Sequence, residues 1–187
     1  MTEIIIGYSI ILIFFIMDFI VRKDKVATSI SKTKDDNNTT KIIIVIFFII
    51  LIVAELLTYF HTGQFEGKTT ARVALVIMLA GVIIRIYSMT RLKKFYTRTL
   101  VTTDRQQLVK TGLYKIIRHP GYLGTILIWS FFGLAIQNYI VFILAFPLIF
   151  IAYVNRIKKE EKMLLTQFGQ EYLNYKNTSW KLVPFIW

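Results

Sequence analysis

Long apolar runs restrict this chain more than any other feature of its sequence. Five such runs alternate with polar segments and cover residues 4–21, 42–60, 71–90, 122–136 and 139–155. An α-helix rises about 1.5 Å per residue, so about 20 apolar residues cross the hydrocarbon core of a bilayer. The first three runs reach that length, whereas the last two, with 15 and 17 residues, are marginal. The pattern predicts an all-α, multi-pass membrane protein with about five transmembrane helices.

Short polar segments separate the apolar runs and set the expected boundaries. Only Gln137 and Asn138 lie between the last two runs, which predicts a tight antiparallel helical hairpin. The first helix of this hairpin is expected to begin near Pro120, because proline is favoured in the first turn of a helix. We divide the chain into N-terminal helices with a polar linker (residues 1–70) and a core (residues 71–187). The core holds the third helix, a polar segment at 91–122, the hairpin at 122–155 and a polar tail at 156–187.

Basic residues gather in three polar segments and predict the orientation of the chain. Lysine and arginine number six in 22–41, eight in 91–121 and six in 156–187, whereas only Lys68 and Arg72 are expected on the opposite side. Cytoplasmic loops are enriched in these residues, so five spans with an outer N-terminus place all three segments, and the C-terminus, on the cytoplasmic side of a cell membrane. The net charge of +12 then suits an anionic lipid surface rather than nucleic acid.

Three charged residues lie inside apolar runs. Asp18 precedes Arg22 by four residues, which favours an ion pair on one helix face near the interface. Arg85 is close enough to the end of its run to extend to the lipid headgroups, and for it both a packing role and a functional role stay open. Glu55 is expected either to pair with another helix or to reach the headgroups.

The first of two polar clusters precedes the predicted hairpin and reads QQLVKTGLYKIIRHPGY over residues 106–122. Pro120 favours an extended His119, and a helix that begins here offers free backbone N–H groups and a positive dipole end to an anion. Tyr114 and Tyr122 supply aromatic faces that suit an adenine ring or a sulfonium cation. The alternative is an interfacial belt of aromatic and basic side chains.

The second polar cluster follows the hairpin and reads RIKKEE over residues 156–161. If the last helix continues past its apolar run, Arg156 and Glu160 share a face, and an ordinary helix-end ion pair is one interpretation. Combined with the first cluster, Glu160 becomes a candidate for binding ribose hydroxyls or an amino group, and Arg156 a candidate for orienting an anionic substrate. A short amphipathic helix in the tail, around 168–175, is expected to lie over this site.

The order of these strings, followed by FGQEYLNY, resembles the isoprenylcysteine carboxyl methyltransferase family and its relatives, including phospholipid methyltransferases. The resemblance covers about residues 80–187 and implies a helical membrane enzyme that takes its methyl group from S-adenosylmethionine at a cytoplasmic site. The implied cofactor-binding residues are Gln106, Leu108, Val109, Tyr114, His119, Pro120, Gly121, Tyr122 and Glu160. The implied catalytic residues are Arg156 and Arg118, and the implied substrate-binding residues are Arg156 and Arg85.

One position departs from the family pattern. Gln106 stands where the family often has histidine, and its amide can hydrogen-bond a cofactor but cannot act as a base. A metal site is not expected, because the chain has no cysteine and only two histidines.

The resulting prediction is a membrane methyltransferase that acts on a carboxylate or other acidic group of a lipidic, prenylcysteine-like substrate entering from the bilayer. One alternative is N- or O-methylation of a phospholipid or small lipid on the same fold. A second alternative, from another class, is a non-catalytic membrane binding protein or small transporter. The oligomeric state is not predicted by the sequence.

Overall fold

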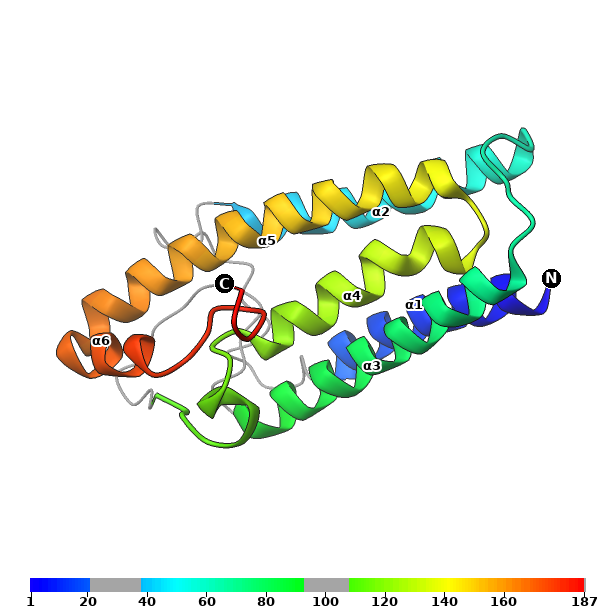
Figure 1. Cartoon of the computed structure of the whole chain (residues 1–187). Helices are drawn as coiled ribbons and strands as arrows, with labels where there is room; N and C mark the ends of the chain where they lie inside the picture. Colours follow the sequence, from blue (N-terminus) through cyan, green and yellow to red (C-terminus); the bar gives the residue numbers. More distant parts are fainter. Residues whose placement is uncertain (21–37, 93–107, 187) are drawn as a thin grey trace.

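Helices form most of the described part of the chain, in the order that the apolar runs predict. The computed structural model describes residues 1–20, 38–92 and 108–186, so Arg22 and Gln106 lie outside the described residues. The elements are α1 (Thr2–Ile20), α2 (Thr39–Tyr59), α3 (Lys68–Leu92), the 3₁₀-helix η3 (Gly112–Lys115), α4 (Pro120–Ala135), α5 (Tyr139–Phe168) and α6 (Gln170–Asn177). The long helices lie alongside one another (Figure 1), which confirms the all-α prediction.

Four of these helices are long and apolar enough to cross a membrane, and α4 is the shorter one. Helices α1, α2, α3 and α5 have 19 to 30 residues, whereas α4 has 16. In Figure 1, α4 runs through the middle of the bundle, with α1 and α3 on one side and α2 and α5 on the other. Most of its side chains are buried. Since protein surrounds α4, this helix does not need the length of a span that faces lipid. The fourth predicted helix, over residues 122–136, is therefore present as a short central helix.

The outer faces of the long helices carry large apolar side chains. Leu12 on α1, Phe48 on α2 and Ile83 on α3 are each more than half exposed, at 60%, 54% and 67%. Soluble monomers rarely expose apolar surface on this scale, whereas lipid chains would cover it. The exposed faces and the helix lengths together describe a multi-pass membrane protein.

Two helix boundaries differ from the sequence prediction. Helix α2 begins at Thr39, inside the segment 22–41 that was expected to be a polar linker, and α5 continues to Phe168 rather than ending near residue 155. The residues beyond 155 are mostly lysine, glutamate, leucine and glutamine, which are good helix formers in water as well as in lipid. A hydropathy pattern marks where the apolar run ends, but the helix itself continues further.

The connections at one end of the bundle, here called the turn end, are hydrogen-bonded to each other. The Phe65 N–H donates to the Gln137 carbonyl at 3.0 Å, and the Tyr139 N–H donates to the Gly63 carbonyl at 3.0 Å. The Asn138 side chain accepts from the Ile140 and Val141 N–H groups, each at 3.1 Å, and so caps α5. These contacts confirm the predicted tight hairpin of α4 and α5, which begins at Pro120 as expected.

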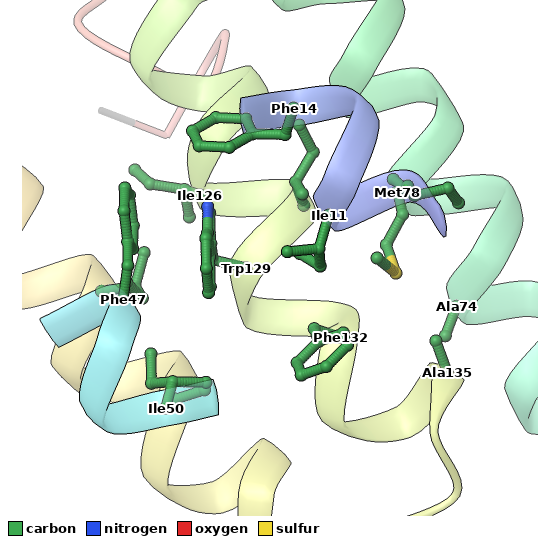
Figure 2. Close-up of a cluster of buried hydrophobic side chains, with 14 of the residues drawn as sticks. Ile11, Phe14, Phe47, Ile50, Ala74, Met78, Ile126, Trp129, Phe132 and Ala135 are labelled. Carbon is green, nitrogen blue, oxygen red and sulfur yellow. The ribbon is translucent and has the colours of Figure 1, made fainter. Parts of the chain in front are cut away.

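Aromatic side chains fill the middle of the bundle, as Figure 2 shows. The rings of Phe47 on α2 and Trp129 on α4 are stacked with centroids 4.0 Å apart, and Phe14 on α1 meets Trp129 edge-on at 5.8 Å. Aromatic pairs in these geometries add to the stabilisation that burial of their area provides. The cluster joins α1 and α2 to α4, so the N-terminal helices are part of one packed core.

Glycines allow α3 and α4 to approach closely. A Cβ added to Gly124 would lie 2.5 Å from the Gly81 carbonyl oxygen, and a Cβ added to Gly81 would lie 2.7 Å from the Gly124 carbonyl oxygen. Both distances are far below van der Waals contact, so only glycine fits at either position. The close approach fixes the start of α4 against α3 at the end of the bundle opposite the turns, here called the site end.

Candidate functional site

One face of α5 changes from apolar to polar as the helix approaches the site end. Its buried side chains recur every three or four residues, at Val141, Ala145, Ile149, Tyr153, Arg156, Ile157 and Glu161. A stripe with this spacing packs against neighbouring elements. The stripe is apolar up to Ile149 and mainly polar from Tyr153 onward. Because the whole stripe is buried, its polar part lies inside the protein, where it contacts the first turns of α4 and α2. We take this region as the candidate active site.

Arg156 is buried and hydrogen-bonded to two other helices. Its Nε donates to the Tyr122 hydroxyl on α4 at 2.9 Å. Its Nη1 donates to the hydroxyls of Thr39 and Thr40 on α2, at 3.2 Å and 2.9 Å. The guanidinium carbon lies 5.5 Å from the centre of the Tyr122 ring, within cation–π range. These contacts differ from an exposed helix-end pair, although Glu160 is close enough to act on the guanidinium electrostatically.

Arg85 lies on another side of α4 and is bonded to Asp18. Its Nη2 donates to the Asp18 carboxylate at 2.9 Å, and its Nη1 donates to the Thr125 hydroxyl. Both side chains of the ion pair are less than a tenth exposed, and the guanidinium lies 4.7 Å from the centre of the Phe14 ring. Arg85 therefore points into the bundle instead of extending to the headgroups. The interpretation of Asp18 as a partner of Arg22 missed this pair, because spacing within one helix does not reveal partners on another.

Tyr153 lies between these two arginine environments. Its ring centre is 5.2 Å from that of Tyr122, and its side chain is 5% exposed. Both Arg85 and Arg156 act electrostatically on its hydroxyl, which is within hydrogen-bonding reach of Thr125. Polar side chains thus continue from Arg85 to Arg156 across the first turns of α4.

His119 lies between two neighbouring carboxylates of α5. Its Nδ1 is 3.7 Å from Glu160 Oε2 and its Nε2 is 3.4 Å from Glu161 Oε1, both longer than a normal hydrogen bond. Its ring is parallel to that of Tyr122, with centroids 5.6 Å apart. Among the described residues, neither His119 Nε2 nor Glu160 Oε2 has a hydrogen-bond partner, although both atoms are buried. Buried polar atoms of this kind indicate a place for a polar ligand.

Arg118 connects α5 to the C-terminal tail. Its Nε donates to Glu161 Oε1 at 3.0 Å, and its Nη1 donates to the Lys176 carbonyl at 3.1 Å and to the Ser179 carbonyl. The backbone joins the same segments, since the Arg118 N–H donates to the Trp180 carbonyl at 2.8 Å. Arg118 is thus buried between the tail and α5.

Helix α6 contacts η3 and the segment before it; the sequence prediction was a tail helix around 168–175 that lies over the site. The Tyr175 hydroxyl donates to the Tyr114 carbonyl at 2.5 Å, and Lys110 Nζ pairs with Glu171 Oε1 at 2.7 Å. Burial raises the pKa of the Tyr175 phenol above its ordinary value, so this donor stays protonated. Gly112 begins η3 with a φ of +63°, and a side chain there would overlap the Tyr87 hydroxyl.

The other predicted cofactor residues lie near the start of α4. Leu108 and Val109 are half-buried in the segment that leads into η3. Pro120 occupies the first turn of α4 and is fully buried. The Gly121 carbonyl accepts hydrogen bonds from the Thr125 hydroxyl at 3.1 Å and from Arg85 Nη1 at 3.4 Å. Gln106 was also predicted to bind the cofactor, but it lies outside the described residues.

Sequence reasoning missed several residues of this site. Thr39 and Thr40 were taken as linker, Tyr153 as ordinary apolar sequence, and Glu161, unlike Glu160, was given no role. The spacing of α5 could have revealed Tyr153 and Glu161, which fall on the buried stripe with Arg156. The threonines carry no such signal, because their partner lies more than 110 positions away in the sequence.

The fold and the site define a multi-pass helical membrane protein with a buried polar site at one end of its bundle. Residues 73–166 match the model of the isoprenylcysteine carboxyl methyltransferase family. That match covers just over half of the 187 residues, and the chain belongs to this family. The matched segment contains Arg85, His119, Arg156 and Glu160, whereas Thr39 and Thr40 precede it.

Known relatives agree with this assignment. The chain is 39% identical over 85 residues to the protein-S-isoprenylcysteine O-methyltransferase of Saccharomyces cerevisiae, covering 42% of this chain and 33% of the yeast protein. It is 29% identical over 136 residues to the enzyme of that name from Tribolium castaneum, covering 69% of this chain and 47% of the relative. The chain thus spans less than half the length of either relative.

A solved structure shares the fold. The structure of a eukaryotic intramembrane Ras methyltransferase, an isoprenylcysteine carboxyl methyltransferase, superposes with a TM-score of 0.75 at 21% identity. The superposition covers 96% of this chain and 65% of the solved chain. The arrangement of helices described above is therefore that of a known membrane protein, including α1 and α2 outside the family match.

Proposed function

We propose that this protein transfers a methyl group from S-adenosylmethionine to a carboxylate or other acidic group of a lipidic, prenylcysteine-like acceptor. The relatives named above are protein-S-isoprenylcysteine O-methyltransferases, which supports both the reaction and the acceptor class. The observation that carries the proposal is the position of buried Arg156 within one turn of Glu160, whose buried Oε2 has no hydrogen-bond partner among the described residues. One end of the bundle thus offers a cationic side chain, Arg156, and beside it a carboxylate, Glu160, that can accept hydrogen bonds from a ligand.

The residues present fit S-adenosylmethionine. Glu160 Oε2 can accept from ribose hydroxyls or an amino group, and His119 Nε2 is a second buried atom available to a polar ligand. The parallel rings of His119 and Tyr122 give flat surfaces beside them. The proposed contacts include the other residues of the first cluster, which are Gln106, Leu108, Val109, Tyr114, Pro120 and Gly121.

The reaction requires positioning more than proton transfer. When bound, S-adenosylmethionine supplies a methyl group on a positively charged sulfur, so that an O–C bond to the acceptor forms as the C–S bond breaks and sulfur keeps the electron pair. A carboxylate has no proton to lose, so no residue of the chain needs to act as a base. The residues of the site therefore bind and align the acceptor and exclude water.

The three arginines have different proposed roles. Arg156 binds the acidic head of the acceptor by charge-assisted hydrogen bonds and is the proposed catalytic residue. Arg118 was also expected to be catalytic, and its bonds to Glu161 and the tail support a role through those partners. Arg85 remains a proposed substrate-binding residue, and its bond to Asp18 adds a role in holding α1 against α3.

Arg156 also favours an acidic acceptor over an amine. Methylation of an amino-phospholipid needs a neutral amine as nucleophile, and a guanidinium next to it would not help that acceptor bind. A phospholipid or small lipid with an acidic or phenolic group stays compatible with the site, since it offers the same anionic oxygen to Arg156. A binding protein or transporter would tolerate loss of Glu160 and would not bind the cofactor.

The proposed orientation places the site end in the cytoplasm of a cell membrane. The sequence segments 22–41, 91–121 and 156–187 hold most of the lysine and arginine of the chain, and cytoplasmic loops are enriched in these residues. S-adenosylmethionine would then reach the site from the cytoplasm, while the acceptor's apolar part stays among lipid chains.

Calorimetry on the purified protein in detergent tests the cofactor first. We expect micromolar binding of S-adenosylmethionine or its demethylated product, and no binding across several detergents and lipids would refute the proposal. Cells with and without the protein, fed methyl-labelled methionine, then give the acceptor. Mass spectrometry of their total lipids should reveal a labelled methyl ester that depends on the protein, whereas a labelled amine would point to the phospholipid alternative.

A further inference from the structure

Helix α2 contributes two hydroxyl groups to the candidate active site, although it precedes the segment that matches the family. The hydroxyls of Thr39 and Thr40 accept hydrogen bonds from Arg156 Nη1 at 3.2 Å and 2.9 Å. Both threonines are buried, at 5% and 4% exposure, in the first turn of α2. We infer that Thr39 and Thr40 are positioning residues that orient Arg156 toward the acidic head of the acceptor, an inference that rests on the function proposed above.

Two helices fix the plane of the Arg156 guanidinium. Tyr122 on α4 takes the Nε donor at 2.9 Å, while the threonines on α2 take Nη1. A guanidinium is planar and its five N–H groups point in fixed directions, so partners at Nε and Nη1 determine the direction of the whole fork. A carboxylate is bound best when it meets this fork edge-on, which makes the orientation of the plane important for the acceptor.

The chemistry of these partners differs from that around the other buried arginines. Arg85 and Arg118 each donate to a carboxylate, from Asp18 and Glu161 respectively. The three hydrogen bonds that Arg156 donates to Tyr122, Thr39 and Thr40 go to hydroxyl oxygens, which are neutral acceptors. These three hydroxyls help to fix the direction of the guanidinium.

The packing of α2 explains why the threonines lie where they do. The buried residues of α2 are Thr39, Thr40, Ile43, Phe47, Ile50 and Ala54, spaced along one face. Phe47 stacks on Trp129 of α4 at 4.0 Å, which sets the height and rotation of the helix. The same stripe that packs in the core thus carries the two hydroxyls to Arg156. N-terminal helices outside the family match would in this way influence which acceptors bind.

Steady-state kinetics on the full chain in detergent test the inference, with labelled S-adenosylmethionine and an S-prenylated cysteine bearing a free carboxylate as acceptor. The test variant is Thr39→Val with Thr40→Val, which keeps the side-chain shape and removes both hydroxyls. We expect kcat/KM for the acceptor to fall about tenfold or more, with a raised KM for the acceptor. The Kd for the demethylated product of S-adenosylmethionine should stay within about twofold of the parent value. Thr39→Ser with Thr40→Ser keeps the hydroxyls and should restore most of the activity.

Thr58→Val is the matched control, because Thr58 lies near the turn end of the same helix, and it should behave like the parent. If the double valine variant is not recovered folded, Thr40→Val alone provides the same comparison with Thr40→Ser. If the valine variants show the same kinetics as the parent, the inference about the threonines is wrong, whereas the proposed function is unaffected. Loss of cofactor binding in step with activity, or failure of serine to rescue, would mean a structural role and would also overturn it. An inactive parent protein would refute the proposed function itself, and the inference with it.

Discussion

Asp18 of α1 and Arg85 of α3 form an ion pair at 2.9 Å inside the bundle, with both side chains less than a tenth exposed. Breaking a buried pair by removing one partner leaves an uncompensated charge and typically costs about 3–5 kcal/mol, whereas replacing both partners by apolar groups is often neutral. We expect Asp18→Leu alone to lower the unfolding temperature in detergent markedly. Asp18→Leu with Arg85→Met should unfold closer to the parent than either single variant does. Equal stability of all four proteins would contradict the buried pair.

Arg156→Lys separates charge from geometry in the proposed acceptor site. Lysine keeps the positive charge but loses the planar fork and the Nε donor that Tyr122 accepts. We expect methyl transfer to fall by at least about tenfold, equivalent to about 1.4 kcal/mol in transition-state stabilisation. Affinity for the cofactor product should change much less, as measured by calorimetry on the same preparation. Turnover near that of the parent would remove Arg156 from the active site and favour an amine acceptor.

Glu160→Gln and His119→Ala test the cofactor contacts. Both residues present buried polar atoms without a hydrogen-bond partner in the described part of the chain, so a bound cofactor would supply the missing partner. Loss of such a partner should weaken cofactor binding by about 1–3 kcal/mol in each variant. Lys158→Ala, at an exposed position on the same helix, is the control and should bind like the parent. Parental affinity in both test variants would mean that the first cluster is an interfacial belt.

Gly124→Ala probes the contact between α3 and α4. Its new Cβ would lie 2.5 Å from the Gly81 carbonyl oxygen, so the two helices must separate at the start of α4. Overpacking of this kind typically costs about 1–3 kcal/mol, and we expect a lower unfolding temperature. Gly7→Ala on α1 is the control, because its Cβ would make an ordinary contact at 3.4 Å with Ala135. If both alanine variants unfold alike, the helices can adjust more easily than the backbone contact indicates.

Sequence periodicity was sufficient for the helices, and short sequence strings were sufficient for the family. Apolar runs predicted the five membrane helices and Pro120 predicted the start of α4, because both signals are local. The strings around His119 and Arg156 indicated the family, which the comparisons confirm.

The cross-helix partners could not be predicted in the same way. Asp18 with Arg85, and Thr39 with Arg156, are pairs separated by 67 and 117 positions. Which helices become neighbours depends on how the whole bundle packs, and a single sequence shows no periodicity for it. The roles assigned to the individual site residues stay predictions until the variants above are measured.

Sixteen residues of α-helix rise about 24 Å, roughly 6 Å less than the hydrocarbon core of a typical bilayer. At the turn end, hydrogen bonds join the connection before α3 to the connection between α4 and α5, so these two connections lie at the same level. The missing length of α4 is therefore at its start, near Pro120. In a bilayer of that thickness, His119 and Tyr122 would then lie deeper than the plane where headgroups meet water. The proposed lipidic acceptor could then present its head at that depth while its tail stays in the leaflet. Binding would not require moving the tail into water, which costs about 0.8 kcal/mol for each buried CH₂.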